Sequence, residues 1–163
     1  MLPLLRVALR VPANARAVST IKPFYTASAS ATGGRLGHVK AESGFETDMV
    51  LPPHLKGPGP SKNAQDPEVL FASGYASCFL GAVNAAAGNL KIAVPAGSTI
   101  TVKTHLGSIQ TNGTGFGLAA DIIGKFPGLD KASAQKLMDT AHNEICPYSK
   151  ATRNNIVVNV HVE

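Results

Sequence analysis

The chain has 163 residues, of which 44% are hydrophobic, and a mean hydropathy of +0.08, which suits one globular domain with a real core and leaves no apolar run near the roughly 20 residues of a membrane span. Its formal net charge is +5, but no basic cluster interleaved with aromatic residues follows the first 20 residues, which argues against a nucleic-acid-binding module. Two cysteines, Cys78 and Cys146, without a C-x-x-C pair, exclude a disulfide framework and argue against a structural zinc site.

Residues 1–20 have the composition of a mitochondrial transit peptide. No acidic residue occurs before Glu42, and three arginines interrupt the apolar run too often for a secretory signal: Arg6, Arg10 and Arg16. We therefore expect a mitochondrial matrix protein with a single domain over residues 21–163. The alternative is a disordered basic tail on a cytoplasmic protein. Removal of residues 1–17 would leave 12 basic against 10 acidic residues, a net charge of +2, so part of the positive charge belongs to this segment.

Three short strands are expected at the start of the domain. From Phe24 to Thr32, small apolar and aromatic side chains alternate with hydroxyl residues, as in a half-exposed strand. Gly33-Gly34 marks a turn, and Arg35 opens a second strand that ends near Ala41. A third alternating run extends from Phe45 to Leu51. Together these patterns predict an antiparallel meander.

The middle of the chain predicts a long loop followed by an apolar helix. Residues 52–66 contain four prolines and two glycines, so they should form either a lid or binding segment or a plain flexible connection. Asp66 fits the N-cap of a helix that has Pro67 at its first position. This helix, which extends to about Ala87, has no polar face. We expect it to be a central helix buried on all sides.

The second half predicts a hairpin, an amphipathic helix and a final strand. Strands are expected over residues 100–106 and 116–122, on either side of a Thr-Asn-Gly-Thr-Gly turn. Asp130 caps a helix whose apolar residues recur with helical spacing until Pro147 ends it. Apolar residues alternate again over 156–162. The element order is βββ-α-ββ-α-β, and the fold class is α+β.

The two cysteines differ in their local setting. Cys78 lies about three turns inside the apolar helix, where burial raises the pKa of a thiol unless a cation lies nearby. Cys146 precedes a proline and should be the last residue of its helix, where the dipole disfavours a thiolate. They therefore divide into a first nucleophile and a resolving thiol. The alternative is that Cys78 is an inert, buried thiol that packs as a small hydrophobic residue.

Three segments resemble the organic hydroperoxide resistance (Ohr) proteins of the Ohr/OsmC family. They are the Thr-Gly-Gly-Arg-Leu-Gly run at 32–37, the run at 66–79 that ends in Gly-Tyr-Ala-Ser-Cys-Phe, and the run at 142–156 that contains Cys-Pro-Tyr-Ser. The likeness covers the chain from about Phe24 to its end, in the expected order. It departs at 44–48, which lacks an Asp-Gly turn, and at Asn154, where glycine is more usual.

The resemblance implies an Ohr/OsmC-like fold and a cysteine-based peroxidase that reduces organic hydroperoxides. Cys78 would be the peroxidatic cysteine and Cys146 the resolving one, which closes an intramolecular disulfide with the sulfenic acid of Cys78. Arg35 would stabilise the thiolate and orient the peroxide, held by a salt bridge from Glu68. Dihydrolipoamide or lipoylated proteins would be the reductant, and no bound cofactor or metal is implied. Relatives are intertwined homodimers with two active sites at the interface, so a homodimer is expected.

The spacing of these residues poses a geometric problem. Ten residues of straight helix span about 15 Å, so Glu68 and Cys78 cannot touch. Either Arg35 bridges them, or the helix bends near Gly74, or a second subunit contributes. Two other functions stay open, an OsmC-like peroxidase with a different substrate preference and a non-enzymatic small-molecule-binding domain with inert thiols.

Overall fold

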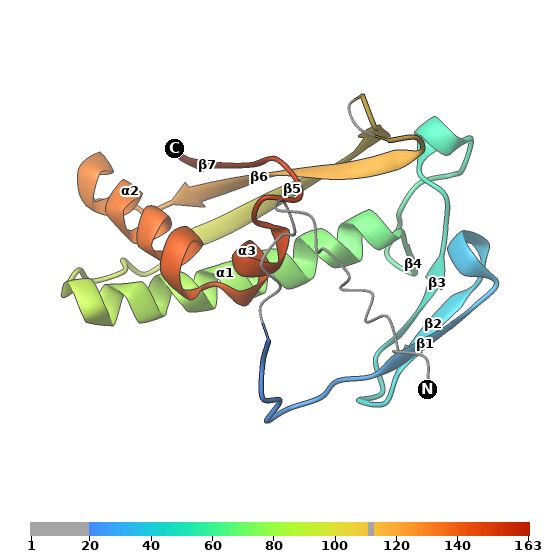
Figure 1. Ribbon diagram of the computed structural model, residues 1–163, viewed down its shortest axis with the longest axis horizontal. Coiled ribbons are helices and arrows are strands. Elements are labelled where there is room, and N and C mark those ends of the chain that lie inside the picture. The colour runs from blue at the N-terminus through green and yellow to red at the C-terminus, as the bar shows by residue number, and fades with distance from the viewer. Residues whose placement is uncertain (1–19, 111–112) are drawn as a thin grey trace, which may run out of the picture.

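The computed structural model describes residues 20–110 and 113–163, so the transit peptide predicted over residues 1–20 falls almost wholly outside the described residues. One sheet runs along most of the length of a long helix, and the other lies near one end of that helix (Figure 1). In chain order the elements are β1 (Ala29–Thr32), a 3-10 turn (Gly34–Leu36), β2 (His38–Ala41), β3 (Glu46–Met49), a second 3-10 turn (Pro53–Leu55), β4 (Ala64–Gln65), α1 (Pro67–Leu90), β5 (Thr99–Ser108), β6 (Phe116–Lys125), α2 (Lys131–Thr140), a π turn (Ala141–Ile145), α3 (Pro147–Thr152) and β7 (Val158–Val162).

The first sheet has the order β1-β2-β3-β4 and the second the order β5-β6-β7. β1, β2 and β3 form the predicted antiparallel meander, and the two-residue β4 joins β3 in parallel within the segment predicted to be a loop. β5 and β6 form the predicted hairpin, to which β7 adds in parallel. The α+β class is thus confirmed. β1 is shorter than predicted, because its pairing with β2 covers only Ala29–Thr32.

Arg35 does not open a strand as predicted but lies in the 3-10 turn before β2. The turn depends on glycine at several positions. Gly33 and Gly34 have φ values of 68° and 60°, in the left-handed region. A Cβ atom at Gly37 would collide with the carbonyl oxygen of Thr32. The Gly-Gly-Arg-Leu-Gly sequence therefore holds Arg35 at a sharp corner of the first sheet.

The helix α1 begins as predicted and is less covered than predicted. The carboxylate of Asp66 accepts a hydrogen bond from the backbone N–H of Val69, and Pro67 is the first helical residue. Only 28% of the most apolar 18-residue window of α1 is buried, so the expectation of burial on all sides is wrong for a single chain. By length and composition alone α1 could also cross a membrane, a test that the central helix of a soluble protein passes as well.

The core lies where α1 packs against the second sheet and α2 (Figure 1). Its largest fully buried side chains are Tyr75, Phe79 and Val83 from α1, Ile122 from β6, and Leu137 and Met138 from α2. The first sheet takes little part in this core, since Met49 is the only buried residue of its four strands. The chain thus has one packed body and one largely uncovered sheet.

The segment around Cys146 differs from the prediction. The helix α2 is capped by Asp130 as predicted, but it passes into a π turn in which the N–H of Cys146 donates to the carbonyl of Ala141 at 2.9 Å. Pro147 does not only end a helix. It forces Cys146 out of the helical region, to φ −62° and ψ 119°, and begins α3, which sequence analysis missed. Cys146 is therefore the non-helical residue that connects the π turn to α3, rather than the last residue of a helix.

Asn154, which follows α3, has a φ of 58°. Asparagine tolerates the left-handed region better than most residues with a side chain. This backbone geometry explains how Asn154 can stand where the family resemblance led us to expect glycine.

Candidate active site

The two cysteine sulfurs lie side by side. Cys78 Sγ is 3.7 Å from Cys146 Sγ, and both thiols are free. A disulfide bond measures about 2.05 Å, so a small movement would join them. Cys78 is partly exposed, whereas Cys146 is fully buried. A small molecule from solvent can therefore meet Cys78 first.

Backbone N–H groups at the start of α3 donate hydrogen bonds to both cysteine sulfurs. The first N–H groups of a helix have no partner within it. The N–H of Ser149 donates to Cys146 Sγ at 3.5 Å, and the N–H of Tyr148 bonds the sulfur of Cys78. Residues that sequence analysis assigned to no helix thus form a donor pair directed at the reactive atoms.

The pKa of the Cys78 thiol is raised above its ordinary value. Burial is the largest cause, and the neighbouring Cys146 thiol adds to it, while the N–H of Tyr148 acts in the opposite direction. None of these groups is a cation. Within the part of the chain that the structure describes, the raised pKa of Cys78 is thus what the sequence analysis expects of a buried cysteine without a nearby cation.

Arg35 and Glu68 form the second pair. The guanidinium binds both carboxylate oxygens of Glu68, at 2.8 and 2.6 Å, in the bidentate geometry that favours strong ion pairs. This hydrogen bonding lowers the pKa of Glu68 and raises that of Arg35. The 3-10 turn of the first sheet and the first turn of α1 are thereby joined.

The structure brings the four predicted site residues together as two pairs, not as one cluster. The helix α1 continues without a break through Gly74 (Figure 1). A bend of the helix near Gly74, which was one of the three alternatives, is therefore not observed. Arg35 is held at Glu68, about 15 Å along the helix from Cys78. A contribution from a second subunit therefore stays a prediction, which a single chain does not test.

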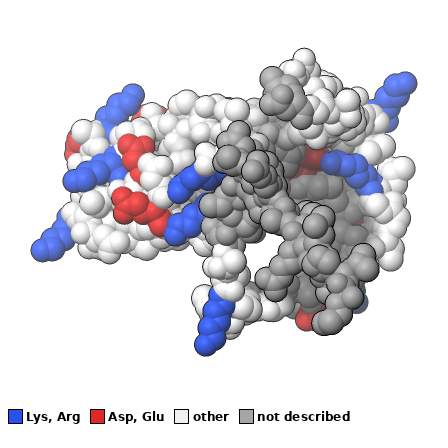
Figure 2. Space-filling view, viewed as in Figure 1, with Lys and Arg blue, Asp and Glu red and all other residues white. Residues whose placement is uncertain are grey.

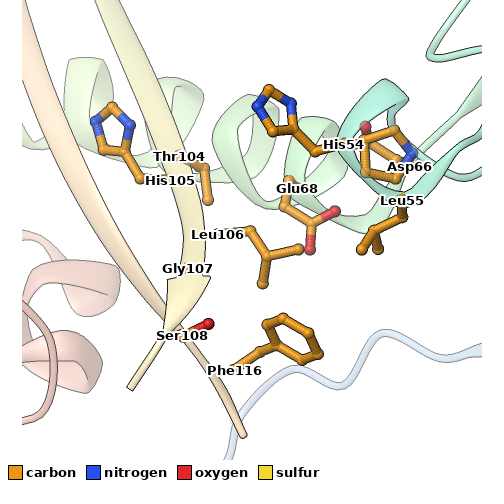
Figure 3. Close-up of a pocket in the computed structure, with 11 residues that line it drawn as sticks. His54, Leu55, Asp66, Glu68, Thr104, His105, Leu106, Gly107, Ser108 and Phe116 are labelled. Atoms are coloured by element: carbon orange, nitrogen blue, oxygen red, sulfur yellow. The ribbon is translucent and has the colours of Figure 1, made fainter. Parts of the chain in front are cut away.

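A cavity of about 510 Å³ lies beside Glu68, whose carboxylate points into it (Figure 3). Its walls come from the segment 52–66, the first turn of α1 and the β5–β6 hairpin. Among the described residues, Thr104 Oγ1 is the one buried side-chain oxygen or nitrogen without a hydrogen-bond partner, and Thr104 lines this cavity. The segment predicted to be a loop therefore forms one wall of a pocket.

A smaller cavity of about 300 Å³ lies between α1 and α3. Its lining is mostly apolar and consists of Phe71, Tyr148, Ala151 and Thr152. The ring of Tyr148 lies over Gly74, where a Cβ atom would be 3.0 Å from the phenolic oxygen. Gly74 therefore serves close packing of α3 on α1, one helical turn before Cys78.

Sequence analysis missed a buried network of polar side chains next to Cys146. Ser149 Oγ lies 3.0 Å from Tyr75 Oη and 3.1 Å from His142 Nδ1, and Tyr75 Oη lies 3.2 Å from Thr152 Oγ1. Burial, followed by the charge of Arg153, lowers the pKa of His142. The only signal in the sequence is that these residues fall inside or beside the two cysteine motifs.

The charges on the visible face are mixed. Figure 2 shows Lys and Arg intermingled with Asp and Glu at the end of the molecule where α2 lies, with no continuous basic patch on its coloured atoms. Across the residues that the structure describes, no group of three or more His, Cys, Asp or Glu side chains could hold a metal ion.

Glu68→Gln is expected to remove an acid-sensitive part of the stability. Because the folded-state pKa of Glu68 is lowered, its contribution is fully present above the unfolded value of about 4.3 and is lost as the pH falls through the folded value. Urea unfolding should therefore show the wild type losing more unfolding free energy than the variant between about pH 5 and pH 3. Glu46→Gln, at an exposed ion pair with Lys40, is the matched control. Equal acid dependence in wild type and Glu68→Gln would contradict this account.

Comparisons with known proteins show what the chain is similar to. Residues 59–161, which include both cysteines and Glu68, match the family of OsmC-like proteins. An organic hydroperoxide resistance protein of Xanthomonas axonopodis pv. citri is 42% identical over 138 residues, covering 84% of this chain and 93% of that protein. The organic hydroperoxide resistance protein OhrB of Bacillus subtilis is 36% identical over 140 residues, covering 86% of this chain and 98% of that protein.

Solved structures show the same fold. The crystal structure of Bacillus subtilis OhrB matches with a TM-score of 0.75 and 34% identity, covering 86% of this chain and all of that one. That of an organic hydroperoxide resistance protein from Legionella pneumophila matches with a TM-score of 0.77 and 36% identity, covering 87% of this chain and 99% of that one.

Proposed function

The chain belongs to the family of OsmC-like proteins, with relatives named organic hydroperoxide resistance proteins, and from that premise we propose that it is a thiol peroxidase that reduces organic hydroperoxides to alcohols. The observation that carries this proposal is the 3.7 Å separation between an accessible and a buried cysteine sulfur. A peroxidase of this type needs one thiol that is accessible to the peroxide and a second thiol close enough to react with the resulting sulfenic acid. The Cys78–Cys146 pair meets both needs.

The proposed reaction has two steps on the protein. The thiolate of Cys78 attacks the distal oxygen of the hydroperoxide, the O–O bond breaks, and the alkoxide leaves as an alcohol after taking up a proton. Cys78 is then a sulfenic acid. The sulfur of Cys146 attacks it, and water leaves as the disulfide forms. The N–H groups of Tyr148 and Ser149 remain directed at the two sulfurs and stabilise negative charge on either of them.

We propose that the active protein is a homodimer in which Arg35 of one subunit approaches Cys78 of the other. Three features support a covering partner. The helix α1 is apolar but largely uncovered, β1 is exposed along its whole length, and large apolar side chains are exposed: Leu36, Phe45 and Phe116. A guanidinium near Cys78 would oppose the effect of burial on the thiol pKa. The Arg35–Glu68 ion pair would place the guanidinium at the cysteine of the other subunit, because the pair already forms within one chain.

The expected substrates are alkyl or fatty-acid hydroperoxides, and the expected reductants are dihydrolipoyl groups. The cavity between Phe71 and Tyr148 offers apolar surface to an alkyl chain, which hydrogen peroxide lacks. In a steady-state assay we expect faster turnover of cumene hydroperoxide than of hydrogen peroxide, and faster reduction by dihydrolipoamide than by thioredoxin. A preference for hydrogen peroxide would favour an OsmC-like peroxidase of different specificity, and a preference for thioredoxin would contradict the lipoyl proposal.

We also propose that the protein acts in the mitochondrial matrix, within reach of lipoylated dehydrogenase complexes. The support is compositional, from Arg6, Arg10 and Arg16 in a segment without acidic residues. A fluorescent protein fused to residues 1–20 should enter mitochondria, and replacing the three arginines by glutamine should prevent entry. Cytoplasmic fluorescence from the unchanged segment would contradict this proposal.

A further inference from the structure

The hydroxyl of Ser149 joins the two elements that carry the cysteines. Ser149 is fully buried, and its Oγ lies 3.0 Å from Tyr75 Oη and 3.1 Å from His142 Nδ1. Tyr75 stands three residues before Cys78 on α1, and His142 stands four residues before Cys146 in the π turn. One oxygen atom thus fixes the position of one sulfur-bearing segment relative to the other.

The hydrogen bonds around this oxygen can all be satisfied at once. Thr152 uses its hydroxyl proton on the backbone carbonyls of Tyr148 and Ser149, at 3.0 and 3.2 Å, so it accepts from Tyr75. Ser149 can then donate to Tyr75 and accept from His142. A buried polar network in which every donor has an acceptor is rigid and specific in geometry.

The same residue also touches the resolving sulfur directly. The backbone N–H of Ser149 donates to Cys146 Sγ at 3.5 Å, while its side chain holds the first turn of α3 against α1 and the π turn. Loss of the hydroxyl would keep the backbone N–H of Ser149. It would remove the hydrogen bonds that hold the first turn of α3, and hence this N–H, in position beside Cys146 Sγ. The distance between the sulfurs would then vary over a wider range.

We propose that Ser149 is a positioning residue for closure of the Cys78–Cys146 disulfide, acting through Tyr75 and His142. In this step the sulfur of Cys146 bonds to that of Cys78, the S–O bond of the sulfenic acid breaks, and hydroxide leaves with the proton of Cys146 as water. Holding the two sulfurs in close approach raises their effective concentration and hence the closure rate. The sulfenic acid as starting point rests on the proposed peroxidase function, whereas the positioning itself does not.

Ser149→Ala tests this role because it removes the hydroxyl and keeps the backbone N–H. We expect closure to slow about tenfold, the effect of one net hydrogen bond, while the bimolecular reaction of Cys78 with cumene hydroperoxide changes less than about twofold. In the steady state kcat should fall and kcat/KM for the peroxide should not. Tyr75→Phe should slow closure in the same direction, and the double variant should be no slower than Ser149→Ala. Ser73→Ala, which removes an exposed hydroxyl of α1, is the matched control.

Stopped-flow peroxide oxidation with mass spectrometry of quenched samples separates the two steps. Equal slowing of both steps would show a merely structural role, and unchanged closure in both Ser149→Ala and Tyr75→Phe would overturn the proposal. If Ser149→Ala does not fold, Tyr75→Phe decides by the same criteria. If peroxide does not oxidise the wild type, the peroxidase proposal fails, and closure is measured instead from the mixed disulfide formed with oxidised glutathione. Slower closure of the variants there would still support positioning, and equal rates would refute it.

Discussion

Cys78→Ser is expected to lose organic hydroperoxide reduction by about 10⁴-fold or more, the order of loss when a covalent nucleophile is removed from an enzyme. Cys78 is the more accessible of the two thiols, and its sulfur receives the N–H of Tyr148. A serine hydroxyl cannot form the sulfenic acid through which the oxygen atom is transferred. Steady-state turnover of cumene hydroperoxide with dihydrolipoamide measures the loss.

Cys146→Ser is the matched variant, because it removes the neighbouring sulfur and leaves Cys78 in place. It should still consume one equivalent of hydroperoxide per subunit. Its mass should then rise by one oxygen atom, as a stable sulfenic acid. Its multiple turnover should be slow. If instead Cys146→Ser does not react and Cys78→Ser does, the assignment of attacking and resolving thiols is reversed.

Arg35→Met is expected to lower the rate of peroxide reduction at neutral pH by about 10- to 10³-fold, the range that corresponds to losing an opposite charge beside an ionisable group. Burial already raises the pKa of Cys78. Without the guanidinium the thiolate forms only at higher pH, so the reaction should recover as the pH rises and its half-maximal pH should move upward. Lys40→Met, which removes an exposed cation from β2 of the same sheet, should leave the pH profile unchanged.

Mixing two variants of low activity at neutral pH distinguishes action across the interface from action within one chain. In a heterodimer of Arg35→Met and Cys78→Ser subunits, a site that spans the interface combines an intact Cys78 with an intact Arg35, and activity should return. If both residues act within one chain, no site in the heterodimer is complete and activity should stay low. The continuous helix between Glu68 and Cys78 predicts the first result.

Local sequence patterns predicted the elements whose determinants lie close together in the chain. The cap at Asp66, the proline that follows it and the alternation in β5 and β6 act over a few residues, and the structure confirms them. Such patterns could not predict α3. Six residues are too few for helical periodicity, and the proline that begins α3 also reads as the end of the preceding helix.

The site itself depends on contacts between distant parts of the chain. Tyr75 and Ser149 are 74 residues apart, and nothing in the spacing of either motif indicates their hydrogen bond. The pairing of Arg35 with Glu68 came only from the family resemblance, because composition does not tell which acid meets which base. The apolar surface of α1 was apparent in the sequence, but a single chain cannot cover it, so a prediction of burial made for one chain was wrong.

Counting thiols after one equivalent of cumene hydroperoxide tests the central claim, that Cys78 and Cys146 act as one redox pair. The account predicts that the full chain loses both alkylatable thiols together, that its intact mass falls by two hydrogen atoms, and that a reductant restores both thiols. Two thiols still open to alkylation and an unchanged mass would mean that the cysteines are inert and that the chain is not a peroxidase.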